Sequence, residues 1–377
     1  MTGHSLHGAS AASASRPVVS SLSLPSVCVV GELPPPMGGM AIQAQKLSEG
    51  LRREGHQVVN VRTNPLAHDS ALRRIRFLRG IVNAAWFLVN LLRAVPRVEC
   101  IHVLSNSQLS FFLFTAPAIV LGRLLGKRVV VHYHGGGAEA FLARWQALAL
   151  PMLRRANAIV VPSGYLAGIF RRYGLLAAEL PNVLDLEGFG FRHRVPLKPL
   201  VIVARHLQPE YAVGVAIRAF AEVARDHPDA RAIIAGDGKE RNSLQGLCEE
   251  LAIADRVRFV GNVPTREMQA LYAMSHIYLN ASRIDNQPVS ILEAFAAGLP
   301  VVSSAAGGIP FLVADGQTGL LAADGTHQSL AAHIRTLLAQ PELAQSLVLN
   351  AHASVQLHRW DAVYARLSAI YRNPGSA

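Results

Sequence analysis

The chain has 377 residues, of which 51% are hydrophobic, with three cysteines and a formal net charge of +11. This length exceeds what a single hydrophobic core usually serves, so two domains are expected, and the composition excludes a fibrous or largely disordered protein. Cys28, Cys100 and Cys248 lie far apart, without the spacing of a metal site or a disulfide framework, which indicates a reducing, cytoplasmic setting.

The first 24 residues are rich in Ser and Ala. They lack a positively charged start followed by an unbroken apolar run, so a secretory signal fits them poorly. We expect residues 1–24 to form a disordered N-terminal tail.

Short apolar, β-branched runs then alternate with longer helical patterns, which is typical of parallel sheets with crossover helices. Strands are expected at 26–30, 57–61, 100–103, 128–132 and 158–161, and in a second series at 200–204, 230–235, 257–260, 276–279 and 300–302. The pattern predicts an α/β protein with two doubly wound sheets.

A segment with three prolines, two glycines and little periodicity, 181–200, separates the two series and is interpreted as the connector. The prediction is one Rossmann-like domain at 25–190 and a second at 191–358. The last helical pattern, 361–371, follows the second series, and residues 359–377 are expected to pack back onto the first domain.

Positive charge is concentrated in the first half, where residues 1–190 hold 19 Lys and Arg against 9 Asp and Glu. Arginines 73, 74, 76 and 79 precede the apolar run 81–92, and this pattern suits a basic amphipathic helix on an anionic membrane surface. A solvated arginine face on a core helix is an equal alternative. The run is too short to span a bilayer, and no nucleic-acid-binding motif accompanies it.

Three motifs follow expected strands, where the ligands of open parallel sheets bind. Gly38 and Gly39 precede a helix and let backbone N–H groups approach a phosphate or a sugar. A tight turn explains them as well, and the G-x-G-x-x-G fingerprint of a nicotinamide site is absent. His134 stands at the end of a strand, before a run of glycines, and is a candidate cleft residue.

The third motif is Asp285 before a helix start and Glu293 eight residues later, inside the helix. The helix start favours a diphosphate, and carboxylates accept hydrogen bonds from sugar hydroxyls. The structural alternative is that Asp285 caps the helix and Glu293 pairs with a basic neighbour.

Asp285 and Glu293 resemble the E-x7-E signature of the family 4 retaining glycosyltransferases of the GT-B fold, with Asp in place of the first Glu. The agreement continues in the family's order, at Gly38-Gly39, His132-Tyr133-His134-Gly135, Pro181-Asn182-Val183, Val203-Ala204-Arg205, Ala235-Gly236-Asp237-Gly238 and Gly307-Gly308-Ile309-Pro310. The resemblance implies two Rossmann-like domains that face each other across a deep cleft.

The resemblance also implies roles for single residues. Glu293 would hold the ribose hydroxyls of the donor, Asp285 the hydroxyls of the transferred sugar, and Arg205 the diphosphate. Backbone N–H groups at Val289 and Ser290 would meet the sugar and the diphosphate, with Pro288 shaping the turn. His134, with His132 as the second choice, would face the reacting sugar.

Two positions depart from the family. The lysine that usually follows the arginine is absent, and Tyr211 stands roughly in its place as a candidate donor contact. The acidic residue that often follows the second glycine pair is Phe311.

The function implied is transfer of a sugar, with retention, from a nucleotide sugar to a hydroxyl of a glycan or lipid-linked oligosaccharide, in cell-surface or exopolysaccharide synthesis. No cofactor and no metal are expected, and a UDP-sugar donor is favoured over a GDP-sugar. The expected location is the cytoplasm, with peripheral membrane association. Two alternatives stay open at this point: a nucleotide-sugar epimerase or phosphorylase on the same fold, and a catalytically silent protein that binds nucleotide sugars as part of a complex.

Overall fold

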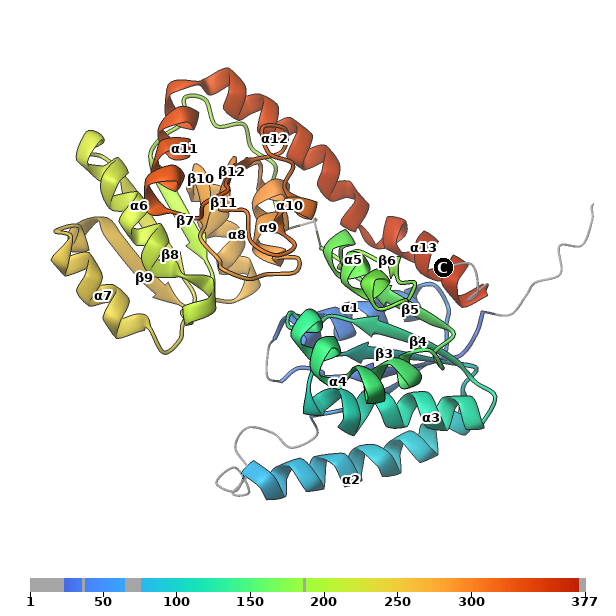
Figure 1. Ribbon diagram of the computed structural model, residues 1–377. Helices are drawn as coiled ribbons and strands as arrows, with labels where there is room; N and C mark the ends of the chain where they lie inside the picture. The colour runs from blue at the N-terminus through green and yellow to red at the C-terminus, as the bar shows by residue number, and fades with distance from the viewer. Residues whose placement is uncertain (1–23, 36–37, 65–75, 186–187, 373–377) are drawn as a thin grey trace, which may run out of the picture.

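The computed structural model describes residues 24–35, 38–64, 76–185 and 188–372, with the side chains of 76–79 and 81 left aside. The expectation for the N-terminal tail therefore lies outside the described residues, apart from Leu24, as do Arg73 and Arg74. Figure 1 shows two α/β units, with the chain crossing from the second back to the first at its C-terminal end.

The first sheet has six parallel strands in the order β2-β1-β3-β4-β5-β6. The strands are β1 (Val27–Gly31), β2 (Val58–Arg62), β3 (Cys100–Ser105), β4 (Arg128–Tyr133), β5 (Ala158–Val161) and β6 (Ala178–Glu179). Its helices are α1 (Gly39–Arg53), α2 (Arg76–Ala94), α3 (Ala116–Leu124), α4 (Ala138–Leu153) and α5 (Gly164–Arg172). Because helices cover both faces, its central strands are buried along almost their whole length, as parallel strands are.

The second sheet is also parallel, in the order β12-β11-β10-β7-β8-β9. Its strands are β7 (Leu200–Ala204), β8 (Arg231–Ala235), β9 (Val257–Gly261), β10 (Ile277–Asn280), β11 (Val301–Ser304) and β12 (Leu320–Ala322). Its helices are α6 (Val213–Asp226), α7 (Arg241–Glu250), α8 (Thr265–Met274), α9 (Val289–Ala297), α10 (Ile309–Leu312), α11 (His327–Ala339) and α12 (Pro341–Val355). The strand order reverses between β7 and β10, and such switch points are where doubly wound sheets bind ligands.

The prediction of two doubly wound α/β sheets is confirmed. All ten expected strands are present, with bounds shifted by at most two residues. The two edge strands β6 and β12 were missed because two or three residues are too few to show an alternating or apolar pattern.

The chain crosses between the two units twice, and the two crossing segments are bonded to each other. His358 Nδ1 lies 3.0 Å from the carbonyl oxygen of Asn182, and the N–H of Leu184 donates to the carbonyl of His358 at 2.9 Å. Beyond this point α13 (Trp360–Arg372) packs its apolar side, including Leu367 and Tyr371, into the core of the first unit.

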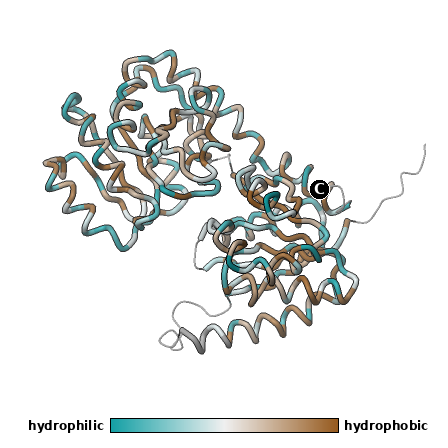
Figure 2. The backbone as a smooth tube through the Cα atoms, viewed as in Figure 1, coloured by the Kyte–Doolittle hydropathy of each residue, from teal (hydrophilic) through white to brown (hydrophobic). Residues whose placement is uncertain are grey.

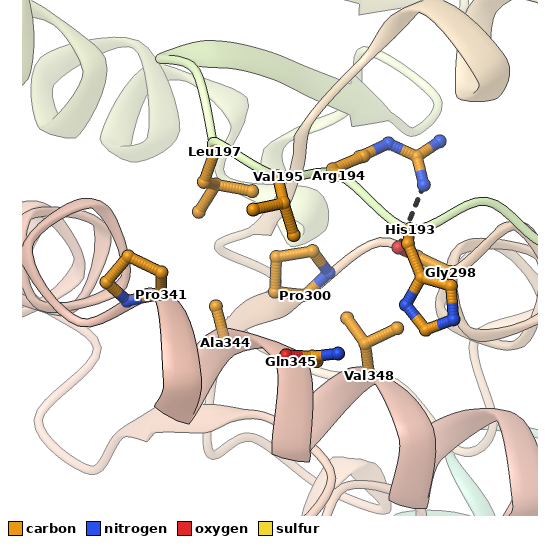
Figure 3. A pocket seen from close by; sticks show the side chains of 10 residues that line it. All are labelled: His193, Arg194, Val195, Leu197, Gly298, Pro300, Pro341, Ala344, Gln345 and Val348. Atoms are coloured by element: carbon orange, nitrogen blue, oxygen red, sulfur yellow. Dashed lines mark hydrogen bonds between the residues drawn. The ribbon is translucent and has the colours of Figure 1, made fainter.

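A buried arginine fastens the start of the second unit. The Arg194 guanidinium donates to carbonyls at the end of α8, those of Tyr272 and Ser275, and at the end of α9, those of Ala297 and Gly298. Figure 3 shows this side chain turned toward Gly298. Helix ends leave carbonyls without intrahelical partners and favour cations, so one side chain stabilises two helix C-termini.

We expect Arg194→Met to lower the free energy of unfolding by about 3 kcal/mol, because several buried carbonyls lose a charged donor together. Arg192→Met is the matched control, since Arg192 is exposed and makes one long bond of 3.4 Å to the carbonyl of Ala273. Its effect should stay within about 0.5 kcal/mol. Urea unfolding measures both, and equal effects would contradict this role of Arg194.

Candidate functional site

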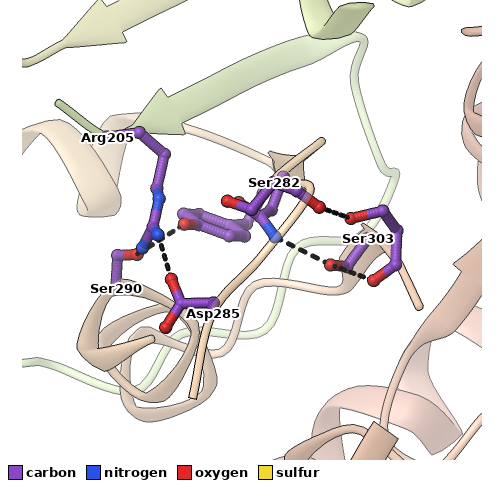
Figure 4. Close-up of polar contacts among 8 residues, drawn as sticks. Arg205, Ser282, Asp285, Ser290 and Ser303 are labelled. Atoms are coloured by element: carbon purple, nitrogen blue, oxygen red, sulfur yellow. Dashed lines mark hydrogen bonds and ion pairs between the residues drawn. The ribbon is translucent and has the colours of Figure 1, made fainter. Parts of the chain in front are cut away.

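An ion pair lies at the switch point of the second sheet. Arg205 follows β7 directly, Asp285 follows β10, and the two side chains form a salt bridge with only 9% and 15% of their surfaces exposed. Arg205 Nη1 also donates to the hydroxyl of Ser290, in the first turn of α9, at 3.2 Å. Figure 4 shows the three side chains turned toward one another.

Tyr211 covers this pair from another direction. Its ring centre lies 4.3 Å from the Arg205 guanidinium carbon, which is a cation–π contact. Burial by itself would lower the pKa of Arg205, but the carboxylate of Asp285 and neighbouring tyrosines outweigh it and raise that pKa. Arg205 therefore stays charged although it is buried.

Glycines hold the two loops that carry the pair. A Cβ at Gly236 would lie 2.0 Å from the carbonyl oxygen of Arg205, and a Cβ at Gly308 would lie 1.9 Å from that of Asn286. Gly307 packs on the backbone of Asp285, and the N–H of Gly308 donates to the carbonyl of Asp285 at 2.6 Å. The glycines of these two sequence motifs thus serve close backbone packing around Arg205 and Asp285.

A buried polar network lies next to the pair, and sequence reasoning missed it. Asn280 Nδ2 donates to Ser303 Oγ at 2.9 Å, Ser282 Oγ donates to Asn280 Oδ1 at 2.8 Å, and Ser304 Oγ donates to the carbonyl of Ser282 at 2.6 Å. Polar residues at the ends of β10 and β11 were the available signal. A cavity of about 400 Å³ opens beside them, at the carboxyl ends of β10, β11 and β12.

Glu293 lies within α9, which also contributes Ser290. The hydroxyl of Tyr272, on α8, donates to its Oε2 at 2.9 Å. Burial raises the pKa of Glu293, and the hydrogen bond from Tyr272 and the charge of Lys46, on α1, work against that rise. A charge from the first domain therefore acts on this carboxylate. The basic neighbour foreseen as the alternative for Glu293 is Lys46, but the direct hydrogen-bond donor is a tyrosine.

The start of α9 carries Pro288 at its N-cap and Val289 as its first residue, and no side chain caps it. The alternative in which Asp285 caps this helix is therefore wrong. The carboxylate of Asp285 turns instead to Arg205, because the loop pinned by Gly307 and Gly308 places it there.

Gly38 is the N-cap of α1 in an extended conformation and Gly39 is its first residue. A Cβ at either position would meet nothing within 4 Å, and neither has a positive φ. Neither packing nor backbone conformation within the described chain demands glycine here, so the space beside them is open. No hydrogen bond among the described residues joins them to the Arg205 cluster.

Three histidines lie in a row in the first domain. Tyr371, on α13, places its hydroxyl 2.9 Å from His102 Nδ1, and His102 Nε2 lies 3.2 Å from His132 Nδ1. The rings of His132 and His134 are 4.1 Å apart. Burial lowers the pKa of His102 to about 3 and that of His134 to about 4, so both rings are neutral at pH 7.

His134 also marks a contact between the two domains, because its carbonyl accepts a hydrogen bond from Asn286 Nδ2 at 3.0 Å. The structure therefore brings Arg205, Tyr211, Asp285 and Ser290 into direct contact, with Glu293 further along the same helix and His134 across the domain contact. Within the described ranges, no group of three or more His, Cys, Asp or Glu side chains has the arrangement of a metal site.

Comparison with known proteins gives the family. Residues 191–353 match the family model "Glycosyl transferases group 1", and residues 37–187 match the model "Glycosyltransferase Family 4". The chain is 30% identical over 292 residues to the GDP-mannose-dependent alpha-(1-6)-phosphatidylinositol monomannoside mannosyltransferase of Mycolicibacterium smegmatis, a match that covers 69% of this chain and 75% of that protein. It is 25% identical over 359 residues to a phosphatidylinositol N-acetylglucosaminyltransferase of Arabidopsis thaliana, covering 89% and 79%.

Among solved structures, HepE of Anabaena in complex with UDP-glucose superposes with a TM-score of 0.73 at 18% identity, covering 92% of this chain and 99% of that one. Two Rossmann-like domains with an acidic and arginine site at the switch point define a GT-B enzyme. This chain belongs to the group 1, family 4 glycosyltransferases, and is a nucleotide-sugar-dependent glycosyltransferase.

The histidine row predicts a pH dependence of stability. The pKa of His102 falls from its ordinary 6.5 to about 3 on folding, so the unfolded chain binds the proton first and stability is lost as pH falls below about 6.5. Between pH 7 and pH 5 one such histidine costs about 2 kcal/mol. In His102→Asn this fall should be smaller by about that amount, as measured by urea unfolding at each pH. An identical fall in the variant and the wild type would rule out this assignment.

Proposed function

We propose that this enzyme moves a sugar, with retention of configuration, from a nucleotide diphosphate sugar to a hydroxyl of a glycan or lipid-linked oligosaccharide. The observation that carries the proposal is the cluster of Arg205, Asp285 and Ser290 at the start of α9, with Glu293 on the same helix. It puts a cation and a helix N-terminus beside two carboxylates, which is the chemistry that a diphosphate linked to two sugars requires.

In the proposed reaction the bond between the anomeric carbon and the diphosphate oxygen breaks, and a bond forms from that carbon to the acceptor oxygen. The acceptor's proton passes to the departing phosphate oxygen. Arg205 and the N–H groups near Val289 and Ser290, shaped by Pro288, would stabilise the charge that grows on the diphosphate. Arg205 Nε has no acceptor among the described residues and is buried, so a phosphate oxygen would supply a missing partner.

The carboxylates and the first domain complete the proposed site. Glu293 would hold the ribose hydroxyls, and Asp285, once a phosphate shares Arg205, would accept from hydroxyls of the transferred sugar. Gly38 and Gly39 leave open space in which backbone N–H groups can approach the donor. His134 would face the reacting sugar as a neutral ring.

The donor base is proposed to be uracil, with guanine second. The relatives support both, since one is named as GDP-mannose-dependent and a structural neighbour contains UDP-glucose. The absence of a positive charge on Tyr211, where the family has a lysine, leaves Arg205 as the main cation for either diphosphate.

The site predicts that Glu293→Gln weakens binding of UDP or GDP by about tenfold to 100-fold, because ribose hydroxyls lose a charged acceptor worth about 1.5–3 kcal/mol. Glu250→Gln, an exposed carboxylate at the end of α7, is the control and should bind as the wild type does. Titration calorimetry with each nucleotide measures this and ranks the two bases. Wild-type affinity in Glu293→Gln would remove the ribose role.

We also propose that the acceptor is lipid-linked and that α2 lies on the membrane surface. Its outward face exposes Trp86, Leu88, Val89 and Leu92, each 41–50% exposed, while Phe87 and Leu91 point into the core. Brown colour recurs along this helix in Figure 2, on the edge of the first domain away from the second. The mycobacterial and plant relatives are both named for phosphatidylinositol-based acceptors.

The neighbouring helix extends this face. α3 exposes Leu124 and also Arg123, and α2 ends with the exposed Arg93. Apolar side chains flanked by arginines suit the interface of an anionic bilayer. No helix within the described ranges is long and apolar enough to cross a membrane, so the contact proposed is with the surface.

Substituting Leu88 and Leu92 by Ser should therefore reduce binding to phosphatidylglycerol vesicles by tenfold or more, since each side chain would bury up to about 2 kcal/mol of apolar surface in the bilayer. The control is Leu349→Ser with Leu357→Ser, two leucines of similar exposure, 47% and 53%, that belong to the α12 region. Vesicle co-sedimentation at low and high salt is the assay. Equal binding of both double variants would contradict a surface role for α2.

A further inference from the structure

The two residues between Asp285 and α9 bond the donor loop to the backbone of the first domain. Asn286 Nδ2 donates to the carbonyl of His134 at 3.0 Å, and Gln287 Nε2 donates to the carbonyl of Pro162 at 2.7 Å. The Oε1 atom of Gln287 accepts from the N–H of Asn182 at 3.1 Å. All three bonds cross from a side chain of the second domain to backbone groups outside it.

The backbone partners come from three separate places. His134 follows β4, Pro162 follows β5, and Asn182 lies in the connector. The first two are the carboxyl ends of neighbouring strands, where the acceptor side of a doubly wound domain faces its partner. Two amides thus reach both strand ends and the hinge segment.

This loop transmits force because its other side is fixed. The N–H of Gly308 donates to the carbonyl of Asp285, and Gly308 packs so closely on Asn286 that a Cβ would lie 1.9 Å from the Asn286 carbonyl oxygen. Asn286 itself is only 9% exposed. The position of its amide is therefore tied to the position of the Asp285 carboxylate and, through the salt bridge, to Arg205.

We propose that Asn286 and Gln287 form an amide latch, a pair of positioning residues that hold the first domain closed over the donor loop. The inference rests on the proposed transfer function of this site. The latch sets His134 opposite Asp285 while a donor is bound, and it keeps water from the anomeric carbon.

Neutral amides suit a contact that must open for each turnover. A net amide–carbonyl hydrogen bond is weak, because water offers the same partners when the domains separate. A buried charge pair between the domains would resist opening more strongly, since separation would leave each charge to find a new partner. An aromatic contact between Tyr165 and Phe311, with ring centres 6.1 Å apart, also joins the two domains.

The test uses the full chain with Asn286→Leu and Gln287→Met, singly and together. These side chains keep approximate size without adding charge, and they leave the carbonyls of His134 and Pro162 without a donor unless the domains open to water. Asn350→Leu is the matched control, because Asn350 Nδ2 donates to a carbonyl, that of Gln317, at the same 3.0 Å but within the second domain.

Small-angle scattering reports the domain arrangement independently of activity. The double variant should have a larger radius of gyration than the wild type and Asn350→Leu. An unchanged radius of gyration would overturn the latch, whatever the assays show.

Donor turnover is the second measurement. The ratio of transfer to donor hydrolysis should fall about tenfold in the double variant, and the Kd for free nucleotide should stay within twofold because Arg205 and Glu293 remain in place. A wild-type ratio would overturn the latch. A wild-type chain that transfers no sugar, with the expected change in scattering, would overturn the proposed function and leave the latch standing.

Discussion

The buried pair of Arg205 and Asp285 is the constraint on which the rest of this site depends. Removing two charges from water costs several kcal/mol per ion, and the cost is offset only if the partners meet in good geometry with their remaining groups bonded. Here the geometry comes from topology, because Arg205 and Asp285 follow neighbouring strands at the switch point. Ser290 and Tyr211 occupy two further sides of the guanidinium.

Every element around the pair limits where it can move. Gly236 and Gly308 let two loops pack backbone to backbone, so the strand ends cannot spread without losing that contact. Arg194 secures α9 at its far end, and the same helix presents Ser290 and Glu293 at the site. Arg194 also bonds the carbonyl of Tyr272, whose hydroxyl reaches Glu293. Stability and site geometry are therefore determined by the same contacts.

The sequence predicted the two sheets and the regions of the site, because apolar runs and motifs at strand ends depend on local pattern. It did not predict that Asp285 pairs with Arg205, since the two are 80 residues apart and only the parallel register brings them together. The histidine row was also out of reach, because His102 and Tyr371 are isolated in sequence and meet through the packing of α13.

The two departures from the family pattern become one feature once the geometry is known. A glutamate at 285 would extend its carboxylate by one methylene, past the position where Asp285 meets Arg205. A lysine at 211 would place a second cation against a guanidinium that has a single carboxylate partner, whereas the Tyr211 ring adds contact without charge. The shortened acid and the aromatic ring therefore balance one buried arginine. In the proposed donor site, a diphosphate would compete with Asp285 for that arginine, so donor binding and release of the Asp285 carboxylate toward the sugar would be coupled.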